Sequence, residues 1–184
     1  MTAAHVLWRR LDTPGHDACR LTASPDGGWL LAGAAAFRHD GAPAHLIYRL
    51  ACDAKWRTRE GIVDGWLGDE RIGHAVQRTA DGWSLDGVTV RGLDACVDLD
   101  LGFTPSTNAL QLRRIALDVG QGADVPVAWL DVVAGTLSLL QQRYERRSHT
   151  AYWYEAPRFD YSAMLAVDAS GFPRVYPHLW EAEP

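Results

Sequence analysis

Hydrophobic and polar positions alternate along the chain with a period of two over many short segments. In residues 45–52, every second side chain is apolar or aromatic. Residues 95–101 alternate in the same way, with Asp98 and Asp100 on one face and aliphatic side chains on the other. Because successive side chains of a strand point to opposite faces, this pattern predicts β-strands with one buried face.

Short turns separate these segments, and their most frequent signal is the pair Asp-Gly. Both residues tolerate positive φ angles, so the pair indicates a hairpin when alternating segments flank it. In three cases a tryptophan follows directly or after one more glycine, and we interpret Trp29, Trp66 and Trp83 as residues that begin antiparallel strands. The pairs are Asp26-Gly27, Asp40-Gly41, Asp64-Gly65, Asp81-Gly82 and Asp86-Gly87.

The second half of the chain continues the pattern. Residues 111–119 and 125–133 flank a stretch with two glycines and predict a hairpin. Residues 137–147 fit a helical face as well as a strand, and we favour a strand because only two residues separate them from the next aromatic run. Further strands are expected at residues 151–155 and 162–168.

These elements predict a mainly β fold. About ten strands joined mostly by short turns suit a curled antiparallel sheet or an incomplete β-barrel. One or two short helices are expected, one at residues 104–107, where a hydroxyl side chain and a proline suit a helix start. The length of 184 residues and the absence of a linker predict a single β-rich domain over residues 1–184. The concave face of such a sheet must be filled by a helix, by side chains or by a ligand.

Composition and charge exclude several classes of partner. The formal net charge is −5 and basic residues never occur more than two in a row, so nucleic acid is not expected. No stretch of 18 apolar residues predicts a membrane-spanning segment. The three cysteines lack the spacing of a zinc site, and the amino-terminal residues lack an apolar leader. We therefore expect reduced thiols, no metal and a cytoplasmic location, while the oligomeric state is not indicated.

The chain contains none of the common catalytic motifs. A GxSxG nucleophile turn, a P-loop, a GxGxxG loop and an HExxH helix are all missing, and the seven histidines are scattered. The sequence therefore favours a protein that is not an enzyme and that needs no cofactor.

Residues 52–59 are the first candidate for chemistry. In an extended segment, Arg57 and Arg59 project from one face and Trp56 from the other. This arrangement suits an anion clamp beside an aromatic plate. The alternative is an ordinary sheet surface on which Asp53 pairs with an arginine.

Asp98 and Asp100 are the second candidate. On one strand face their side chains lie about 7 Å apart, a distance between those of retaining and inverting glycosidases. We expect these carboxylates to pair with arginines, and acid–base catalysis is the alternative. The arginines available for such pairs are Arg57, Arg59, Arg113 and Arg114.

Two further regions are rich in side chains that bind ligands. Residues 103–114 combine hydroxyl and amide groups, among them Asn108, with two arginines; such a segment can hold a phosphate or a sugar, or simply complete turns. The last third of the chain is aromatic and includes Tyr144, Tyr176 and Trp180. Alternating rings usually belong to a core, but the high share of tyrosine favours a partly wet cavity.

Four segments, taken in order, resemble a bacterial protein family of unknown function named "putative glycolipid-binding". The likeness extends from the region of Trp8 to Trp180. It implies a curved antiparallel sheet around a cavity that faces an amphiphile, similar to the bacterial lipoprotein-localisation carriers. Gln111 stands where the family pattern has a proline, so a different local bend is expected. The four segments are residues 52–59, residues 98–110 with Arg113 and Arg114, residues 142–144 and residues 175–180.

We therefore expect non-enzymatic binding of a lipid-like or glycolipid-like molecule in a concave β-sheet cavity, where burial of its chain contributes about 0.8 kcal/mol per CH₂. The alternatives are a small hydrolase or isomerase that uses Asp98 and Asp100, and a structural or protein-interaction module. The residues expected to contact the ligand are Trp56, Arg57, Arg59, Asp98, Asp100, Asn108, Arg113, Tyr144, Tyr176 and Trp180.

Overall fold

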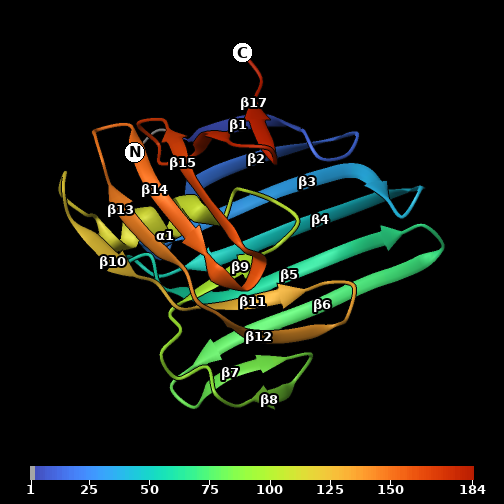
Figure 1. Cartoon of the computed structure of the whole chain (residues 1–184). Coiled ribbons are helices and arrows are strands. Elements are labelled where there is room, and N and C mark those ends of the chain that lie inside the picture. The colour runs from blue at the N-terminus through green and yellow to red at the C-terminus, as the bar shows by residue number, and fades with distance from the viewer. Residues whose placement is uncertain (1–2) are drawn as a thin grey trace.

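The structure, a computed structural model, describes residues 3–184, so Met1 and Thr2 of the expected domain lie outside the described residues. Within residues 3–184, fourteen strands form one large sheet and three form a small one. Figure 1 shows that the large sheet is curled. The large sheet does not close into a barrel, because β8 and β10 are its two unpaired edges. The predicted fold class is confirmed, although the strands are more numerous than the ten expected.

The first half of the chain is an antiparallel meander in which each strand pairs with the next. Its strands are β1 (Ala4–Arg10), β2 (Gly15–Ala23), β3 (Trp29–His39), β4 (Ala42–Cys52), β5 (Thr58–Leu67), β6 (Glu70–Thr79), β7 (Gly82–Leu85) and β8 (Val88–Val90).

The second half supplies the helix, the small sheet and the rest of the large sheet. The small sheet has the order β12-β11-β9, and β11 runs parallel to β9. The elements are β9 (Asp98–Leu101), α1 (Asn108–Ile115), β10 (Gly122–Asp124), β11 (Val127–Asp131), β12 (Thr136–Leu140), β13 (Arg143–Arg146), β14 (Ala151–Ala156), the 3-10 turn η1 (Pro157–Phe159), β15 (Tyr161–Val167), β16 (Pro173–Tyr176) and β17 (Trp180–Ala182).

Three of the five Asp-Gly pairs lie between strands, as predicted, and Asp81-Gly82 lies at the turn where β7 begins. At Asp40-Gly41 and Asp86-Gly87 both residues have positive φ, which is the geometry of the two-residue hairpin turn that Asp-Gly favours. The prediction for Asp64-Gly65 is wrong, because this pair lies inside β5. A Cβ on Gly65 would lie 3.0 Å from the Cα of Leu46, so this glycine allows the backbones of β4 and β5 to approach closely.

The predicted hairpin of residues 111–119 and 125–133 is wrong, since α1 occupies the first of these segments. The alternation of leucines there also fits a helical face, and the basic residues Arg113 and Arg114 in the last turn suit the helix dipole. The helix predicted at residues 104–107 is misplaced: these residues form the turn before α1, which begins at Asn108. The predicted strand 137–147 is divided into β12 and β13, which belong to different sheets.

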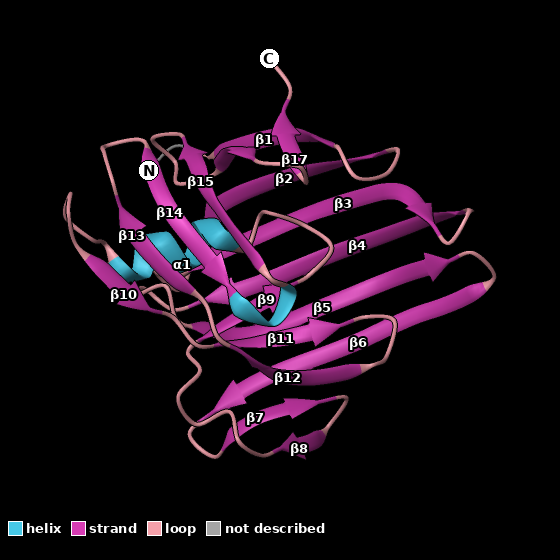
Figure 2. Cartoon of the chain, viewed as in Figure 1, coloured by secondary structure: helices cyan, strands magenta, loops and turns pink. Residues whose placement is uncertain are grey.

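The small sheet and α1 fill the concave side of the large sheet, as Figure 2 shows. The strand predicted at residues 95–101 is confined to β9, and all four residues of β9 are buried, so the carboxylates of Asp98 and Asp100 lie inside the protein. Leu99 of β9 would overlap a Cβ on Gly61 of β5, which shows how closely the two strands pack. The inner layer leaves little of the concavity open.

Gly33 of β3 makes room for the ring of Tyr48, whose hydroxyl lies in the interior between β2 and the loop that follows β9. The Tyr48 hydroxyl donates to the buried carboxylate of Asp17, 2.9 Å away. A Cβ at position 33 would lie 2.7 Å from the Ala18 carbonyl oxygen and would overlap the Tyr48 ring. Gly33 is therefore a packing requirement of the large sheet.

We expect Gly33→Ala to lower the free energy of unfolding by about 2–3 kcal/mol, because both the Tyr48 ring and the β2 backbone must shift. Urea denaturation measures the change. Gly73→Ala is the matched control, since a Cβ on this exposed strand glycine meets nothing closer than 3.6 Å. Equal stability of the two variants would contradict this account of Gly33.

Candidate functional site

A cavity of about 340 Å³ lies between the small sheet and strands β14 to β17 of the large sheet. One wall comes from β9, the loop after it and the start of α1, and the opposite wall comes from the aromatic strands of the last third of the chain (Figure 1). Its lining residues are Asp100, Leu101, Gly102, Thr104, Pro105, Asn108, Trp129, Leu140, Gln142, Tyr154, Ala156, Phe159, Tyr161, Tyr176, Leu179 and Trp180. We call this space the aromatic cavity.

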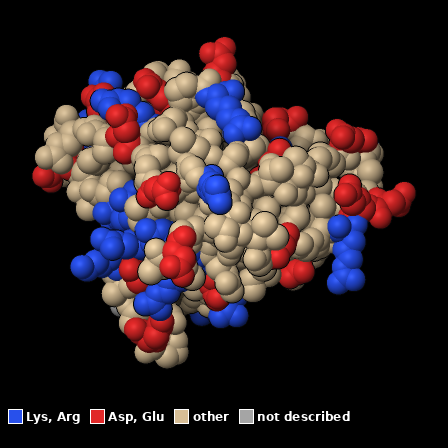
Figure 3. Space-filling view, turned by 90° about the horizontal axis from the view of Figure 1, so that it is seen from below, with Lys and Arg blue, Asp and Glu red and all other residues tan. Residues whose placement is uncertain are grey.

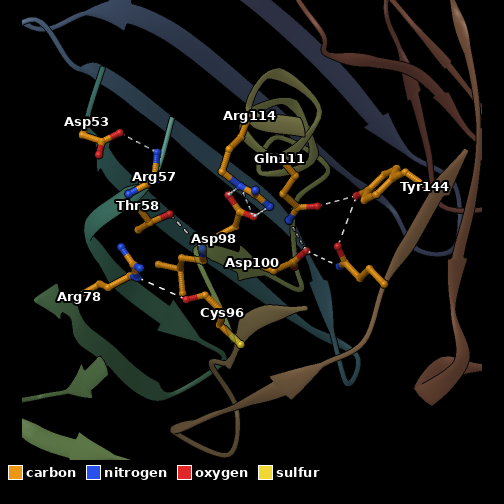
Figure 4. Close-up of polar contacts among 12 residues, drawn as sticks. Asp53, Arg57, Thr58, Arg78, Cys96, Asp98, Asp100, Gln111, Arg114 and Tyr144 are labelled. Carbon is orange, nitrogen blue, oxygen red and sulfur yellow. Dashed lines mark hydrogen bonds and ion pairs between the residues drawn. The ribbon is translucent and has the colours of Figure 1, made fainter. Parts of the chain in front are cut away.

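The polar end of the aromatic cavity is a closed hydrogen-bond network (Figure 4). The side-chain amides of Gln111 and Gln142 donate to Oδ2 of Asp100 at 3.2 and 2.8 Å. The Tyr144 hydroxyl donates to Oε1 of Gln111 at 2.6 Å and accepts from Nδ2 of Asn108 at 2.6 Å. These contacts fix the orientation of Asp100 from three separate elements.

Asp100 is the one carboxyl group among the described lining residues of the aromatic cavity. Burial raises the pKa of its carboxyl, and the two glutamine amides act in the opposite direction. Among the described residues, none donates a hydrogen bond to its second oxygen, Oδ1, which is not fully enclosed. This oxygen is therefore available to a group that enters the cavity.

The opposite wall is built from rings that contact one another. The Tyr154 and Tyr176 rings lie 5.6 Å apart edge to face, and the Tyr161 ring lies 5.3 Å from Tyr176. Trp129 contacts Phe159 at 5.3 Å, and Phe159 is 50% exposed, which places it at the rim. The cavity thus combines a polar end with apolar ring faces and an apolar rim.

Asp98 does not share the cavity with Asp100. Arg114 donates three hydrogen bonds to it at 2.7–2.9 Å, which form a forked pair inside the protein (Figure 4). The prediction that an arginine neutralises a carboxylate of this strand is thus met by Arg114 at Asp98. Burial raises the pKa of Asp98, and the Arg114 charge lowers it.

The ten predicted ligand residues do not form one site. Asp100, Asn108, Tyr176 and Trp180 line the aromatic cavity, and Tyr144 lies directly behind it. Trp56 and Arg113 line a second cavity. The side chains of Arg57 and Arg59 are exposed and line neither of these two cavities, so they do not form the predicted anion clamp beside Trp56. Arg59 pairs with Asp26 of the β2–β3 turn.

Several cavity residues were missed by the sequence patterns. Trp129, Gln142 and Tyr154 all lie in segments that the sequence analysis recognises, but none of the three is singled out there as a ligand residue. The signal for Gln142 was its position two residues before Tyr144, which allows both to face the same network. Trp129 has no local signal, because β11 reaches the cavity through its parallel pairing with the distant β9.

A buried carboxylate supports the loop that lines the aromatic cavity. Asp17 accepts hydrogen bonds from the Tyr48 and Thr104 hydroxyls, and Thr104 is a lining residue. Burial raises the pKa of Asp17 to about 6, although both hydroxyls lower it. Thr104 is thus held by the Asp17 carboxyl, whose ionised form is disfavoured inside the protein.

Other classes of site find little support in the described structure. No group of three His, Cys, Asp or Glu side chains in residues 3–184 is arranged to hold a metal. No helix in these residues has the length and apolar character needed to cross a membrane. On the face seen in Figure 3, basic and acidic side chains are interspersed, so that face carries no broad basic patch.

Comparison with known proteins agrees with this architecture. The model of the family described as "Putative glycolipid-binding" matches residues 5–182. A crystal structure of a DUF1089 family protein from Pseudomonas aeruginosa is similar, with 27% sequence identity, a TM-score of 0.79 and coverage of 90% of each chain. No curated protein matches the chain.

We expect Asp17→Asn to flatten the dependence of stability on pH. A carboxyl whose pKa is raised from 3.8 to about 6 binds its proton more tightly in the folded chain. The protonated Asp17 carboxyl therefore makes its full contribution to the free energy of unfolding below about pH 4. As the pH rises through about 6, the free energy of unfolding decreases by about 3 kcal/mol.

Urea denaturation at a series of pH values from 4 to 7 measures this difference. The exposed turn variant Asp69→Asn is the control and should keep the wild-type profile. If Asp17→Asn shows the same pH dependence as the wild type, Asp17 is not the group responsible.

Proposed function

Because the chain belongs to the family described as "Putative glycolipid-binding", we propose that it binds the sugar-bearing end of a glycolipid-like amphiphile in the aromatic cavity. The observation that carries the proposal is the juxtaposition of the Asp100 network with a wall of tyrosine and tryptophan rings around one cavity. Binding, without chemical conversion of the ligand, is the proposed activity.

The chemistry of the cavity suits a sugar. Sugar hydroxyls are donors and acceptors, and the carboxylate of Asp100 and the amides of Asn108 and Gln142 offer the complementary groups. The faces of a sugar ring carry C–H groups, for which the faces of Trp129 and Tyr176 are apolar partners.

The size of the cavity limits what it can enclose. At about 340 Å³ it lies at the lower end of the range of about 300–1,000 Å³ for small-molecule pockets. It therefore suits one head-group unit with the first part of an acyl or alkyl chain. The rest of the ligand's acyl or alkyl chain would leave the cavity past the exposed ring of Phe159. Each CH₂ group of the chain that is buried there would contribute about 0.8 kcal/mol to the binding free energy.

The hydrolase or isomerase alternative is less well supported. It requires Asp98 and Asp100 to converge in one cleft, whereas only Asp100 lines the aromatic cavity and Asp98 is paired with Arg114. The interaction-module alternative expects a flat patch of exposed tryptophans. All eight tryptophans lie within the described residues, and among them only Trp66 is exposed.

The proposal includes the cytoplasmic location expected from the sequence, in which case the ligand would be a precursor or metabolite. All three cysteines lie within the described residues and are free thiols, which agrees with a reducing compartment.

We expect the purified, delipidated protein to retain an amphiphile after incubation with bacterial lipid extract, as detected by native mass spectrometry. With octyl glucoside as a defined probe, we expect saturable binding by calorimetry. Asp100→Asn removes the charged acceptor and should weaken binding about tenfold. Trp129→Leu should weaken it by a similar factor through loss of the ring face.

Trp66→Leu is the matched control, because this tryptophan lies on the exposed side of β5, and it should bind octyl glucoside like the wild type. Retention of no amphiphile from the extract, together with equal binding of octyl glucoside by all variants, would overturn the proposal. Turnover of generic glycosides or esters that Asp100→Asn abolishes would instead support the enzyme alternative.

A further inference from the structure

A second cavity, of about 280 Å³, lies at the other end of α1. It shares no lining residue with the aromatic cavity, although Tyr152 and Tyr154, two residues apart on β14, line one cavity each. Its lining residues are Trp56, Leu112, Arg113, Ala116, Arg146, His149, Tyr152, Val167, Asp168, Ala169 and Gly171. We call this space the arginine cavity.

Arg146 of the arginine cavity is held in place by neutral groups. Its guanidinium donates to the backbone carbonyls of Leu117, Ser148 and His149 at 2.7, 3.2 and 3.3 Å, and it lies 5.6 Å from the centre of the Tyr152 ring. Carbonyl oxygens and a ring face orient a guanidinium without cancelling its charge.

Arg113 approaches the cavity from α1. Its Nε donates to the carbonyl of Ser170 at 2.8 Å, and its guanidinium carbon lies 4.9 Å above the Trp56 ring. Burial lowers the pKa of Arg113, and the charge of Asp168 acts in the other direction. Arg113 is thus a partly desolvated cation with a fixed position.

Asp168 is the one carboxylate among the described lining residues of the arginine cavity. Its Oδ1 accepts hydrogen bonds from the backbone N–H groups of Ser170 and Phe172, so it also holds the turn between β15 and β16. With two guanidiniums and one carboxylate, the lining residues carry a net positive charge.

The backbone conformation and ring contacts of Trp56 are a further feature of the arginine cavity. Its φ angle of 65° is unusual for a bulky residue and costs about 1–2 kcal/mol. The ring is stacked on Trp29 at 4.2 Å on one face and carries Arg113 on the other. The loop is fixed by Asp53, whose Oδ1 accepts from the N–H groups of Lys55 and Arg57. The strained Trp56 thus places its ring against the Arg113 guanidinium.

We propose that the arginine cavity binds a compact phosphate-type oxyanion between the guanidiniums of Arg113 and Arg146. Guanidinium groups bind phosphate oxygens through two parallel N–H donors, and both are anchored here before any ligand arrives. The volume is small for a nucleotide base with its phosphates, and the Trp56 ring is already covered on both faces, so a single phosphate group is the expected occupant. This site is independent of the function proposed for the aromatic cavity.

Calorimetric titration of the full chain with inorganic phosphate at low ionic strength tests the proposal. We expect saturable binding that Arg113→Gln weakens at least tenfold and that Arg147→Gln leaves unchanged. Arg147 is the matched control because it is an exposed arginine next to Arg146 that pairs with Glu145. Asp168→Asn keeps an oxygen acceptor for the turn and removes the negative charge, so it should tighten binding several-fold.

Glycerol phosphate and vesicles with phosphatidic acid distinguish the source of the phosphate. Binding of inorganic or glycerol phosphate that depends on Arg113 indicates a soluble ligand, and such binding to the vesicles alone indicates a lipid head group. If none of the three probes binds, or if Arg113→Gln and Asp168→Asn both bind like the wild type, the proposal is wrong. Octyl glucoside carries no anion, so its binding by Arg113→Gln reports separately on the aromatic cavity.

Discussion

The forked ion pair between Asp98 and Arg114 connects the helix to the small sheet, and both cavities depend on that connection. Asn108, Gln111 and Arg114 are spaced by three residues, so they share one face of α1. This face is polar and turns inward, toward the carboxylates of β9, and not toward solvent. Removal of Arg114 would leave the buried carboxylate of Asp98 without its cation, which is why this contact constrains the position of the helix on the small sheet.

The alternation of side chains was enough to predict the fold class and several strands of the large sheet, among them β4, β14 and β15. In β4, the residues predicted to share the buried face are all buried. This strand is long and pairs with a neighbour on each side, so its side chains alternate regularly between the buried and the exposed face. Asp-Gly pairs marked four of the turns of the first-half meander for a similarly local reason. Gly65 is the exception, since its role is set by the close approach of another strand.

The inner layer and the cavities could be predicted only in part, because their determinants are distant in sequence. The leucines of 110–112 fit a strand and a helix equally, and the helix is selected by the partners that Gln111 and Arg114 find on β9. Asp100 and Asn108 were identified from local chemistry and do line one cavity. Arg57 was misplaced because the expected extended geometry is broken at Trp56, whose positive φ no pattern of residue types indicates.

The pairing of β1 with β17 has a consequence for the order of folding. Trp8 lies opposite Ala182, and its indole donates to the Pro173 carbonyl, so the amino-terminal strand completes its contacts only with the last residues of the chain. During synthesis on the ribosome, this edge of the meander therefore stays open until β17 (Trp180–Ala182) has emerged. Such long-range pairing slows folding and exposes an edge to other chains in the meantime. The architecture that encloses the cavities thus makes the nascent chain dependent on its own carboxyl-terminal strand for protection.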